Sequence, residues 1–403
     1  MKFIQGGITA PCGFRCNGIH CGIRKNKSKA DLALIISEVT ASAAAVYTQN
    51  KVKGAPIAVT KANLADGKAA AVICNSGNAN TCNADGVEIA EKMCVLVEKH
   101  TGISANDVIV ASTGVIGQKL DVTPIADGME ELVNGLGKKS DKAAEAIMTT
   151  DTRLKECAVE FTLGGKTCRI GGIAKGSGMI NPNMATMLVF VTSDVSVSPD
   201  MLKKAVKSSA DETFNMISVD GDTSTNDMLS VMANGLAGNP FIETENEDYY
   251  TFLTALNAVN AHLSRMIASD GEGATKLLEC KVSGAKTLKD ARIAAKGVIS
   301  SSLLKAAMFG SDANWGRVLC ALGYCGADLD VEKVGVSFIS EGGEIEVCKD
   351  GHGVDFDEVL AKKILSEKEI VINVTLADGD CAATAWGCDL TYDYVKINGD
   401  YRT

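Results

Sequence analysis

The stretch KGSGMINPNMATMLVFVTSD, residues 175–194, decides how the rest of the chain is interpreted. It begins with Gly176-Ser177-Gly178, where bare backbone can turn sharply or approach a ligand closely. Asn181-Pro182-Asn183 then predicts a turn. The run TMLVFVT, which starts at Thr186, has the length and the β-branched content of a buried strand. The stretch therefore predicts a glycine-rich loop and a turn that lead into a buried strand headed by a threonine.

A threonine in this place suggests one kind of chemistry. Its hydroxyl is a weak nucleophile unless a base lies beside it, and one available base is the residue's own α-amine. If the bond between Ala185 and Thr186 breaks, Thr186 gains a free amine with an ordinary pKa of about 7.7–8.0, close to working pH. A threonine that heads a strand after a turn is also ordinary local sequence, so the pattern alone leaves both interpretations open.

The segment KGSGMINPNMATML resembles the processing-site motif of the ornithine acetyltransferase family, also called bifunctional glutamate N-acetyltransferases. The resemblance covers nearly the whole chain, because further motifs of that family follow in the same order. They are GGITAPCGFRCNGIHCGIRK from Gly6, CNSGNANTCN from Cys74, ASTGVIG from Ala111, TTDT from Thr149, DGDTSTND from Asp220, SDGEGATK from Ser269, SDANWGRVLCALG from Ser311 and the terminal YVKINGDYRT.

The resemblance implies a layered α/β fold: a sandwich of the N-terminal-nucleophile type, similar to aminopeptidases and ornithine acetyltransferases, with a second, smaller α/β domain. The domains are expected at residues 1–275 and 276–403, and the last residues are expected to return to the active site. Self-cleavage after Ala185 would give chains 1–185 and 186–403, each holding part of the core. Two copies of each chain are expected to form a heterotetramer.

The same resemblance assigns the site. Thr186 is the expected nucleophile, and Thr113 and Gly114 are the expected donors to the anionic tetrahedral intermediate. By themselves, Thr113 and Gly114 also fit an ordinary strand–turn junction. The residues that match the family's substrate-binding positions are Thr152, Lys175, Thr186, Glu272, Asn398 and Thr403. Lys175 could contact a substrate carboxylate and Glu272 an ornithine ammonium group.

The implied reaction moves an acetyl group from N2-acetyl-L-ornithine to L-glutamate in arginine biosynthesis, through an acetyl-threonine intermediate. No metal or organic cofactor is expected, although acetyl-coenzyme A is a possible second acetyl donor. An aminopeptidase-like amidohydrolase with the same threonine nucleophile is the main alternative. A cofactor-binding oxidoreductase and a self-cleaving protein without catalytic activity are the other two.

Composition limits the partners. The net charge of −10 argues against nucleic acid and anionic membranes as partners, and no apolar run is long enough to span a bilayer. The 14 cysteines include no C-x-x-C pair, and most lie in apolar segments, so we expect free thiols and a cytoplasmic protein. The cluster Cys12, Cys16, His20 and Cys21 does not have the spacing of common zinc sites.

Two glycine-rich motifs do not bind nucleotides in this interpretation. The GGKT segment at 164–167 lacks the earlier glycine of a phosphate loop, because that position is Glu160. GSGMIN at 176–181 lacks the third glycine of a dinucleotide fingerprint. Residues 75–80 fit a ligand-facing loop but fit a tight surface turn slightly better, and the acids of 220–227 fit capping better than a calcium loop.

Periodicity predicts the elements. Strands are expected at 30–37, 57–61, 69–74 and 107–112. Helices are expected at 86–100, 198–212 and 249–267. Asp85 is the expected cap of the first helix and Ser198 of the second. From about residue 278 strands and helices alternate. The C-terminal segment LTYDYVKINGDYRT is expected to be strand-like.

Overall fold

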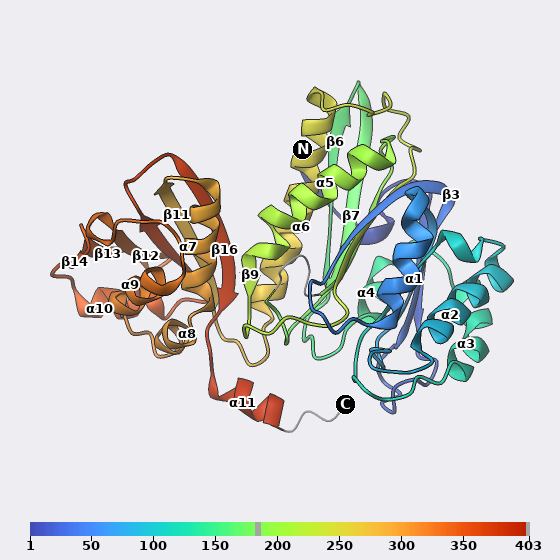
Figure 1. Ribbon diagram of the computed structural model, residues 1–403, viewed down its shortest axis with the longest axis horizontal. Coiled ribbons are helices and arrows are strands. Elements are labelled where there is room, and N and C mark those ends of the chain that lie inside the picture. Colours follow the sequence, from blue (N-terminus) through green and yellow to red (C-terminus); the bar gives the residue numbers. More distant parts are fainter. Residues whose placement is uncertain (182–186, 400–403) are drawn as a thin grey trace.

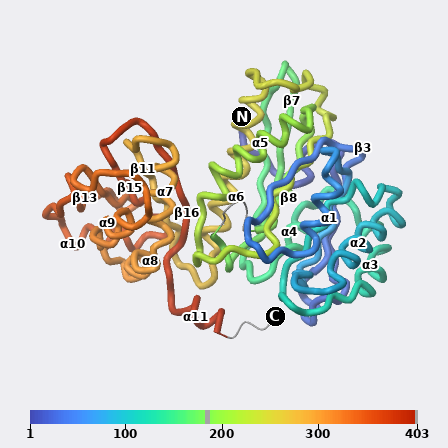
Figure 2. Tube along the Cα trace, in the orientation of Figure 1, coloured from blue at the N-terminus to red at the C-terminus, as the bar shows by residue number. Residues whose placement is uncertain are grey.

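The structure is a computed structural model that describes residues 1–181 and 187–399. Two β-sheets organise these residues, one of nine strands and one of seven. They form two units that lie side by side, and the C-terminal helix α11 (Tyr392–Gly399) lies below the junction between them (Figures 1 and 2).

The nine-stranded sheet forms the first unit. Its strand order is β1-β6-β7-β8-β10-β3-β4-β5, and β2 pairs with β3 outside this path. The pairs β8–β10 and β4–β5 are parallel, and the other pairs are antiparallel. The strands are β1 (Lys2–Ile4), β2 (Phe14–Ile19), β3 (Leu32–Tyr47), β4 (Lys68–Asn75), β5 (Val108–Ser112), β6 (Lys155–Leu163), β7 (Lys166–Lys175), β8 (Leu188–Ser193) and β10 (Met228–Ala233).

The long strand β3 divides this sheet into two halves. Its register with β4 shifts between Ile36 and Ala41, so its first half pairs with β2 and β4 while its second half pairs with β10. One apolar cluster joins both halves: it contains Ile35 and Val72 from one half and Ile173 and Phe190 from the other. The halves therefore face each other across a shared core, as two layers of a sandwich.

Helices cover the two outer faces of this sandwich (Figure 1). α5 (Pro199–Glu212) and α6 (Glu247–Ser269) pack on the β6–β7–β8 side, and their apolar faces belong to a cluster with Val159 and Val189. A separate cluster joins β3, β4 and β5 to the opposite helices, which are α1 (Ala55–Asn63), α2 (Gly86–Thr101) and α3 (Thr123–Asn134). α4 (Ser140–Ala146) adds its alanines to the core between the halves. The layered α/β class predicted from the sequence is confirmed.

The seven-stranded sheet forms the second unit, with strand order β14-β13-β12-β15-β11-β16-β9. Its strands are β9 (Ile217–Ser218), β11 (Leu277–Ala285), β12 (Gly335–Ser340), β13 (Gly343–Lys349), β14 (His352–Gly353), β15 (Glu369–Thr375) and β16 (Cys381–Cys388). Its helices are α7 (Leu288–Ser300), α8 (Ser302–Phe309), α9 (Trp315–Tyr324) and α10 (Glu358–Leu365).

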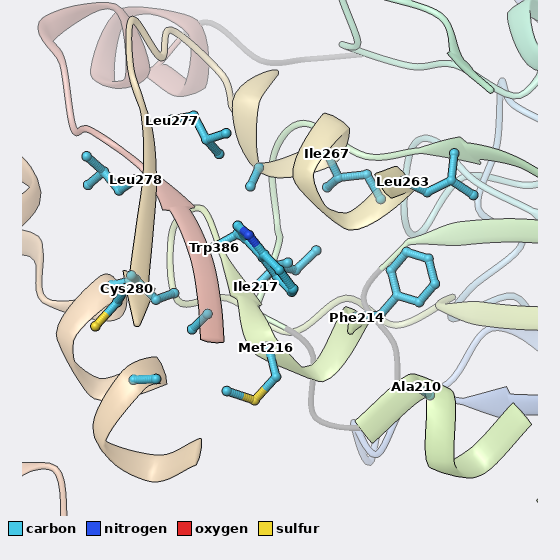
Figure 3. Close-up of a cluster of buried hydrophobic side chains, with 14 of the residues drawn as sticks. Ala210, Phe214, Met216, Ile217, Leu263, Ile267, Leu277, Leu278, Cys280 and Trp386 are labelled. Carbon is cyan, nitrogen blue, oxygen red and sulfur yellow. The ribbon is translucent and has the colours of Figure 1, made fainter. Parts of the chain in front are cut away.

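The apolar core is continuous between the two units. β9 comes from the chain between α5 and β10, yet it pairs with β16 of the second sheet. Beside this pair, Phe214 and Ile217 meet Trp386 of β16 and Ile267 of α6 in one buried cluster (Figure 3). The described parts of the two units are therefore joined by buried side chains as well as by the chain.

Two expected elements differ from the structure. Residues 57–61 were expected as a strand but belong to helix α1, because Pro56 starts a helix well and the Thr60 hydroxyl bonds to both backbone groups of Val110. Tertiary contacts thus override the β preference of Ile57 and Val59. The C-terminal segment was expected as a strand, but residues 392–399 form helix α11, which has no buried residue and pairs with no sheet edge.

The expected caps have different outcomes. The Ser198 hydroxyl accepts a hydrogen bond from the amide of Met201 at 3.3 Å, so the predicted cap of α5 is confirmed. Asp85 precedes α2, but its side chain makes no capping bond, and that prediction is wrong. The Asp85 carboxylate lies 3.3 Å from the Lys119 ammonium group instead.

Candidate active site

A cavity of about 490 Å³ lies where several strands of the first sheet end. Five of the residues predicted from the sequence line it: Thr113, Gly114, Lys175, Glu272 and Asn398. They come from four separate parts of the chain, so the fold brings together what the sequence keeps far apart. Another cavity, of about 500 Å³, lies between α10 and the segment after α8 and contains none of the predicted residues.

The ends of β4 and β5 build one wall of this cavity. The Asn75 carbonyl accepts a hydrogen bond from the Thr113 amide at 2.9 Å, and the Asn75 side chain donates to Ser112 Oγ at 2.7 Å. Asn75, Ser76 and Asn78 are buried. The slight preference for a surface turn at 75–80 is therefore wrong: this segment supports Thr113 from behind, and Ala79 lines the cavity.

Gly114 has a backbone that only glycine adopts easily at this place. Its φ is +127°, and a Cβ atom there would lie 2.7 Å from the carbonyl carbon of Gly77. The close approach of the 113–114 backbone to residues 77–78 leaves no room for a side chain. The conformation of the Thr-Gly pair is thus set by packing against a neighbouring loop.

The cavity contains opposite charges. Lys175, at the end of β7, is nearly buried, and its ammonium nitrogen lies 3.4 Å from Thr113 Oγ1. The Glu272 carboxylate accepts a hydrogen bond from the Asn398 amide at 2.8 Å. Gly178 must lack a side chain because a Cβ there would lie 2.3 Å from Glu272 Oε2. A molecule with both a carboxylate and an ammonium group therefore finds a partner for each charge.

The segment 224–226 adds polar groups that the sequence analysis did not assign to the site. Ser224, Thr225 and Asn226 line the cavity. The Asn226 side chain donates to the carbonyls of Ala79 and Ser112 and accepts from the hydroxyls of Thr81 and Thr225, which ties β10 to the wall formed by β4 and β5. The sequence contained a signal for this: hydroxyl and amide side chains at residues 223–226 come shortly before the buried strand β10.

One acid of this loop, Asp220, has the favoured role of capping backbone amides, whereas Asp227 Oδ2 is buried and has no hydrogen-bond partner among the described residues. Asp220 accepts hydrogen bonds from the amides of Met179 and Ile180, at 2.6 and 2.9 Å. Among the described residues, no group of three or more His, Cys, Asp or Glu side chains could hold a metal ion.

Thr152 does not line the same cavity as the other five residues. It lines a neighbouring cavity of about 490 Å³, and its hydroxyl donates to Asp270. Ala185, Thr186 and Thr403, the predicted cleavage pair and terminal binding residue, lie outside the described residues. Met187, which directly follows Thr186 in the chain, is buried, and its carbonyl accepts from the Met228 amide at 2.8 Å.

No helix within residues 1–181 or 187–399 has the length and apolar content needed to cross a membrane.

Comparison with known proteins gives a consistent result. The sequence profile of the ArgJ family matches residues 15–403. The arginine biosynthesis bifunctional protein ArgJ 1 of Clostridium acetobutylicum is 51% identical over 398 residues, which are 98% of this chain and 97% of that protein. The arginine biosynthesis bifunctional protein ArgJ of Caldanaerobacter subterraneus subsp. tengcongensis is 51% identical over 405 residues and 100% of both chains.

A solved structure is also similar. The crystal structure of arginine biosynthesis bifunctional protein argJ from Bacillus halodurans matches with 44% identity and a TM-score of 0.50, and the match covers 53% of this chain and 98% of that one. The family resemblance inferred from the motifs is confirmed by these matches. The chain belongs to the ArgJ family.

Proposed function

We propose that this protein transfers an acetyl group from N2-acetyl-L-ornithine to L-glutamate and so acts in arginine biosynthesis. One observation carries the proposal: a single cavity gathers Thr113, Gly114, Lys175, Glu272 and Asn398, and Gly178 and Met179 also line it. The names of the relatives, which are bifunctional proteins of arginine biosynthesis, support the same pathway.

The nucleophile in this proposal is Thr186, freed by cleavage of the bond between Ala185 and Thr186. Its amine takes the proton of its hydroxyl, and the oxygen attacks the acetamide carbon of acetylornithine. The carbonyl oxygen becomes negative, and the Thr113 hydroxyl and the Gly114 amide stabilise it. The amine then returns the proton to the leaving nitrogen, the C–N bond breaks, and ornithine leaves an acetyl ester on Thr186.

The second half of the reaction runs in the opposite direction. The neutral amine of glutamate attacks the ester carbon, its proton passes to the Thr186 amine, and that amine returns a proton to the threonine oxygen as the ester bond breaks. N-acetylglutamate and free Thr186 result. Both halves use one nucleophile, one base and one pair of oxyanion donors, so the reaction needs no cofactor. Acetyl-coenzyme A is proposed as a second possible donor of the same acetyl group.

The charged groups of the cavity suit both amino-acid substrates. Lys175 would bind a substrate carboxylate, and Glu272, held by Asn398, would bind the ornithine ammonium group. Thr152 and Thr403 belong to the same proposed set of binding residues. Each charge is nearly buried, so each contact would be stronger than the same contact at the surface.

The length of the solved relative supports self-cleavage. About half of this chain covers nearly all of the Bacillus halodurans chain, whereas the ArgJ proteins of similar sequence match over their full length. A chain of half length is what cleavage near the middle produces. We further propose that the two fragments stay together, that two such pairs form a heterotetramer, and that the enzyme works in the cytoplasm.

The experiment is a comparison of the wild-type protein with the Thr186→Ala variant. The wild type should run as two bands on a denaturing gel, while Thr186→Ala should run as one band and lose at least about 1,000-fold in activity. Product analysis with and without glutamate separates transfer from hydrolysis: N-acetylglutamate should form, and free acetate should not replace it. A single intact and active wild-type chain would exclude the mechanism.

A further inference from the structure

A second buried lysine lies directly behind the cavity. Lys155, at the start of β6, is 1% exposed and contacts two aspartates at once. Its ammonium nitrogen lies 2.7 Å from Asp151 Oδ1 and 2.5 Å from Asp270 Oδ2. Both aspartates are themselves buried. A buried triad of one cation and two anions is stable only where hydrogen bonds satisfy the remaining oxygens.

Those hydrogen bonds come from the segments that line the cavity. Asp151 accepts from the Gly176 amide at 2.7 Å, directly after Lys175, and from the amide of Thr149, a lining residue, at 2.9 Å. Asp270 accepts from the Thr152 amide at 3.0 Å and also from its hydroxyl. Each carboxylate of the triad is therefore bonded to backbone at the edge of the proposed site.

A second set of bonds connects the triad to Glu272. The Asp270 carbonyl accepts from the Ser177 hydroxyl at 2.6 Å, and the Ser177 carbonyl accepts from the Glu272 amide at 3.0 Å. The segment that follows Lys175 and the loop with Glu272 are thus joined in two ways: directly by Ser177, and through Asp151, Lys155 and Asp270. Among the described residues, Lys155 is the group that bonds both carboxylates.

We propose that Lys155 is a positioning residue: by binding Asp151 and Asp270 together, it fixes the distance between Lys175 and Glu272 across the cavity. This inference rests on the proposed function for the identity of the substrates. It assigns Lys155 no contact with substrate. Because the two pocket charges must match a carboxylate and an ammonium group at a set separation, a shift of either loop would weaken binding and misplace the acetyl carbon.

The electrostatics agree with this geometry. Burial alone would raise the pKa of Asp151, but the positive charges of Lys155 and Lys175, together with hydrogen bonds from Lys155 and the Thr149 amide, lower that pKa to about 2. Asp151 therefore stays ionised at working pH. The Asp151 carboxylate interacts electrostatically with both Lys155 and Lys175, which links the triad to the lysine that lines the cavity.

The first experiment compares Lys155→Met with Lys276→Met in the full-length protein. Lys276 is also a buried lysine, but its ammonium nitrogen donates to Met308 O, Ser311 Oγ and Leu365 O, and none of these residues lines the proposed site. Both variants lose a buried ammonium group and should lower the melting temperature. Only Lys155→Met should raise KM for acetylornithine and glutamate and lower kcat/KM, by about 100-fold.

A second variant separates the positioning role of Lys155 from its contribution to the stability of the fold. The double change Asp151→Asn with Lys155→Met removes one anion and one cation, so the net charge of the triad is unchanged. Its melting temperature should lie above that of Lys155→Met, because one buried carboxylate, Asp270, is left without its cation instead of two. Its kcat/KM should stay low, because the link through Lys155 between Asp151 and Asp270 is still missing and only the Ser177 bonds remain. Recovery of both quantities would show that Lys155 is only structural and would overturn the proposal.

Hydrogen–deuterium exchange gives a readout that does not depend on activity. In Lys155→Met, the amides of 152–153, 176 and 272 should lose protection, while in Lys276→Met they should keep it. Wild-type protection and a wild-type KM in Lys155→Met would overturn the positioning role. If the wild-type protein transfers no acetyl group but Lys155→Met still loses protection at these amides, the proposed function fails and the positioning role remains.

Discussion

Buried lysines behave differently in the two units of this protein. In the first unit, Lys155 lies between two carboxylates, and Lys175 lies beside the Thr113 hydroxyl at a cavity. In the second unit, Lys276 donates to two carbonyls and a hydroxyl, and Lys305 donates to the Cys388 carbonyl. Neither of these two forms an ion pair within residues 1–181 and 187–399.

The comparison shows how a buried charge can be interpreted. Lys276 donates its hydrogen bonds to neutral groups, among them carbonyls near the ends of α8 and α10. Burial lowers the pKa of this lysine. Where opposite charges lie around a cavity instead, some charge remains available to a ligand. The first arrangement supports the fold, and the second one supports binding. The predictions below test this difference, beginning with the largest expected effect.

Gly114→Ala should damage the cavity wall most. A Cβ atom at this position meets the backbone of residues 77–78, and the φ of +127° disfavours any other residue. We expect kcat to fall about 100- to 1,000-fold, because an oxyanion donor moves. Gly117→Ala is the matched control: its φ is +78°, but a Cβ atom there has no neighbour within 4 Å. Equal losses in both variants would mean that backbone strain, not donor position, matters.

Lys305→Met should damage the second unit without affecting catalysis. Lys305 is buried and donates to the Cys388 carbonyl, which would lose this partner. We expect the free energy of unfolding to fall by about 1–3 kcal/mol in urea titrations, while kcat/KM per folded molecule stays unchanged. A large loss of kcat/KM at full folding would contradict the division between the two kinds of buried lysine.

Two buried aspartates of the first unit, Asp151 and Asp227, should change the stability of the fold with pH in opposite directions. The pKa of Asp151 is lowered to about 2. Its ionised form therefore stabilises the fold above the ordinary aspartate pKa near 4, and this contribution is lost as the pH falls toward 2. Burial raises the pKa of Asp227 well above its ordinary value, although the Ser224 hydrogen bond and the Lys175 charge oppose this. The folded state then keeps a proton that the unfolded chain releases, so stability decreases as the pH rises above about 4.

Asp227→Asn should therefore stabilise the protein at pH 7 but not at pH 4. The Asp227 Oδ2 atom is buried and has no hydrogen-bond partner within the described part of the chain, so the amide should replace a protonated carboxyl with little loss. Urea unfolding at the two pH values measures the difference. A gain of equal size at both values would show that the titration of Asp227 is not responsible.

Asn398→Ala should have the smallest effect. It removes the amide that donates to Glu272 at 2.8 Å, and one such hydrogen bond contributes about 1 kcal/mol. We expect KM for acetylornithine to rise about fivefold with kcat nearly unchanged. Val395→Ala, on the same helix, should leave KM at its wild-type value, since Val395 is exposed and lines neither this cavity nor the neighbouring one. An equal rise in KM in both variants would mean that the helix as a whole, and not the bond to Glu272, sets KM.

The sequence predicted much of the fold because local patterns and tertiary contacts agree there. The apolar runs of residues 69–74 and 108–112 form the buried strands β4 and β5, and Ser198 caps α5, as local patterns alone predict. The site residues were predicted from short motifs, and five of those in the described chain line one cavity.

Other features depend on contacts that no local pattern records. The helix at 55–63 is held by Thr60 against Val110, fifty residues away. The burial of residues 75–80 follows from the neighbouring Thr113 strand end. The pairing of Lys155 with Asp270 joins residues 115 positions apart. Asp151 precedes β6, which begins at Lys155, so their spacing of four residues is not that of a helical turn.

The strand order of the large sheet has a consequence for a cleaved chain. β8 and β10 lie next to each other, and their outer neighbours are β7 and β3, which both precede residue 185. A break between residues 185 and 186 would leave a two-stranded insert from one product between strands of the other. The products could separate only by opening two hydrogen-bonded ladders inside a sandwich. The two products would then separate only as fast as the native sandwich unfolds, and no covalent bond between them would be needed.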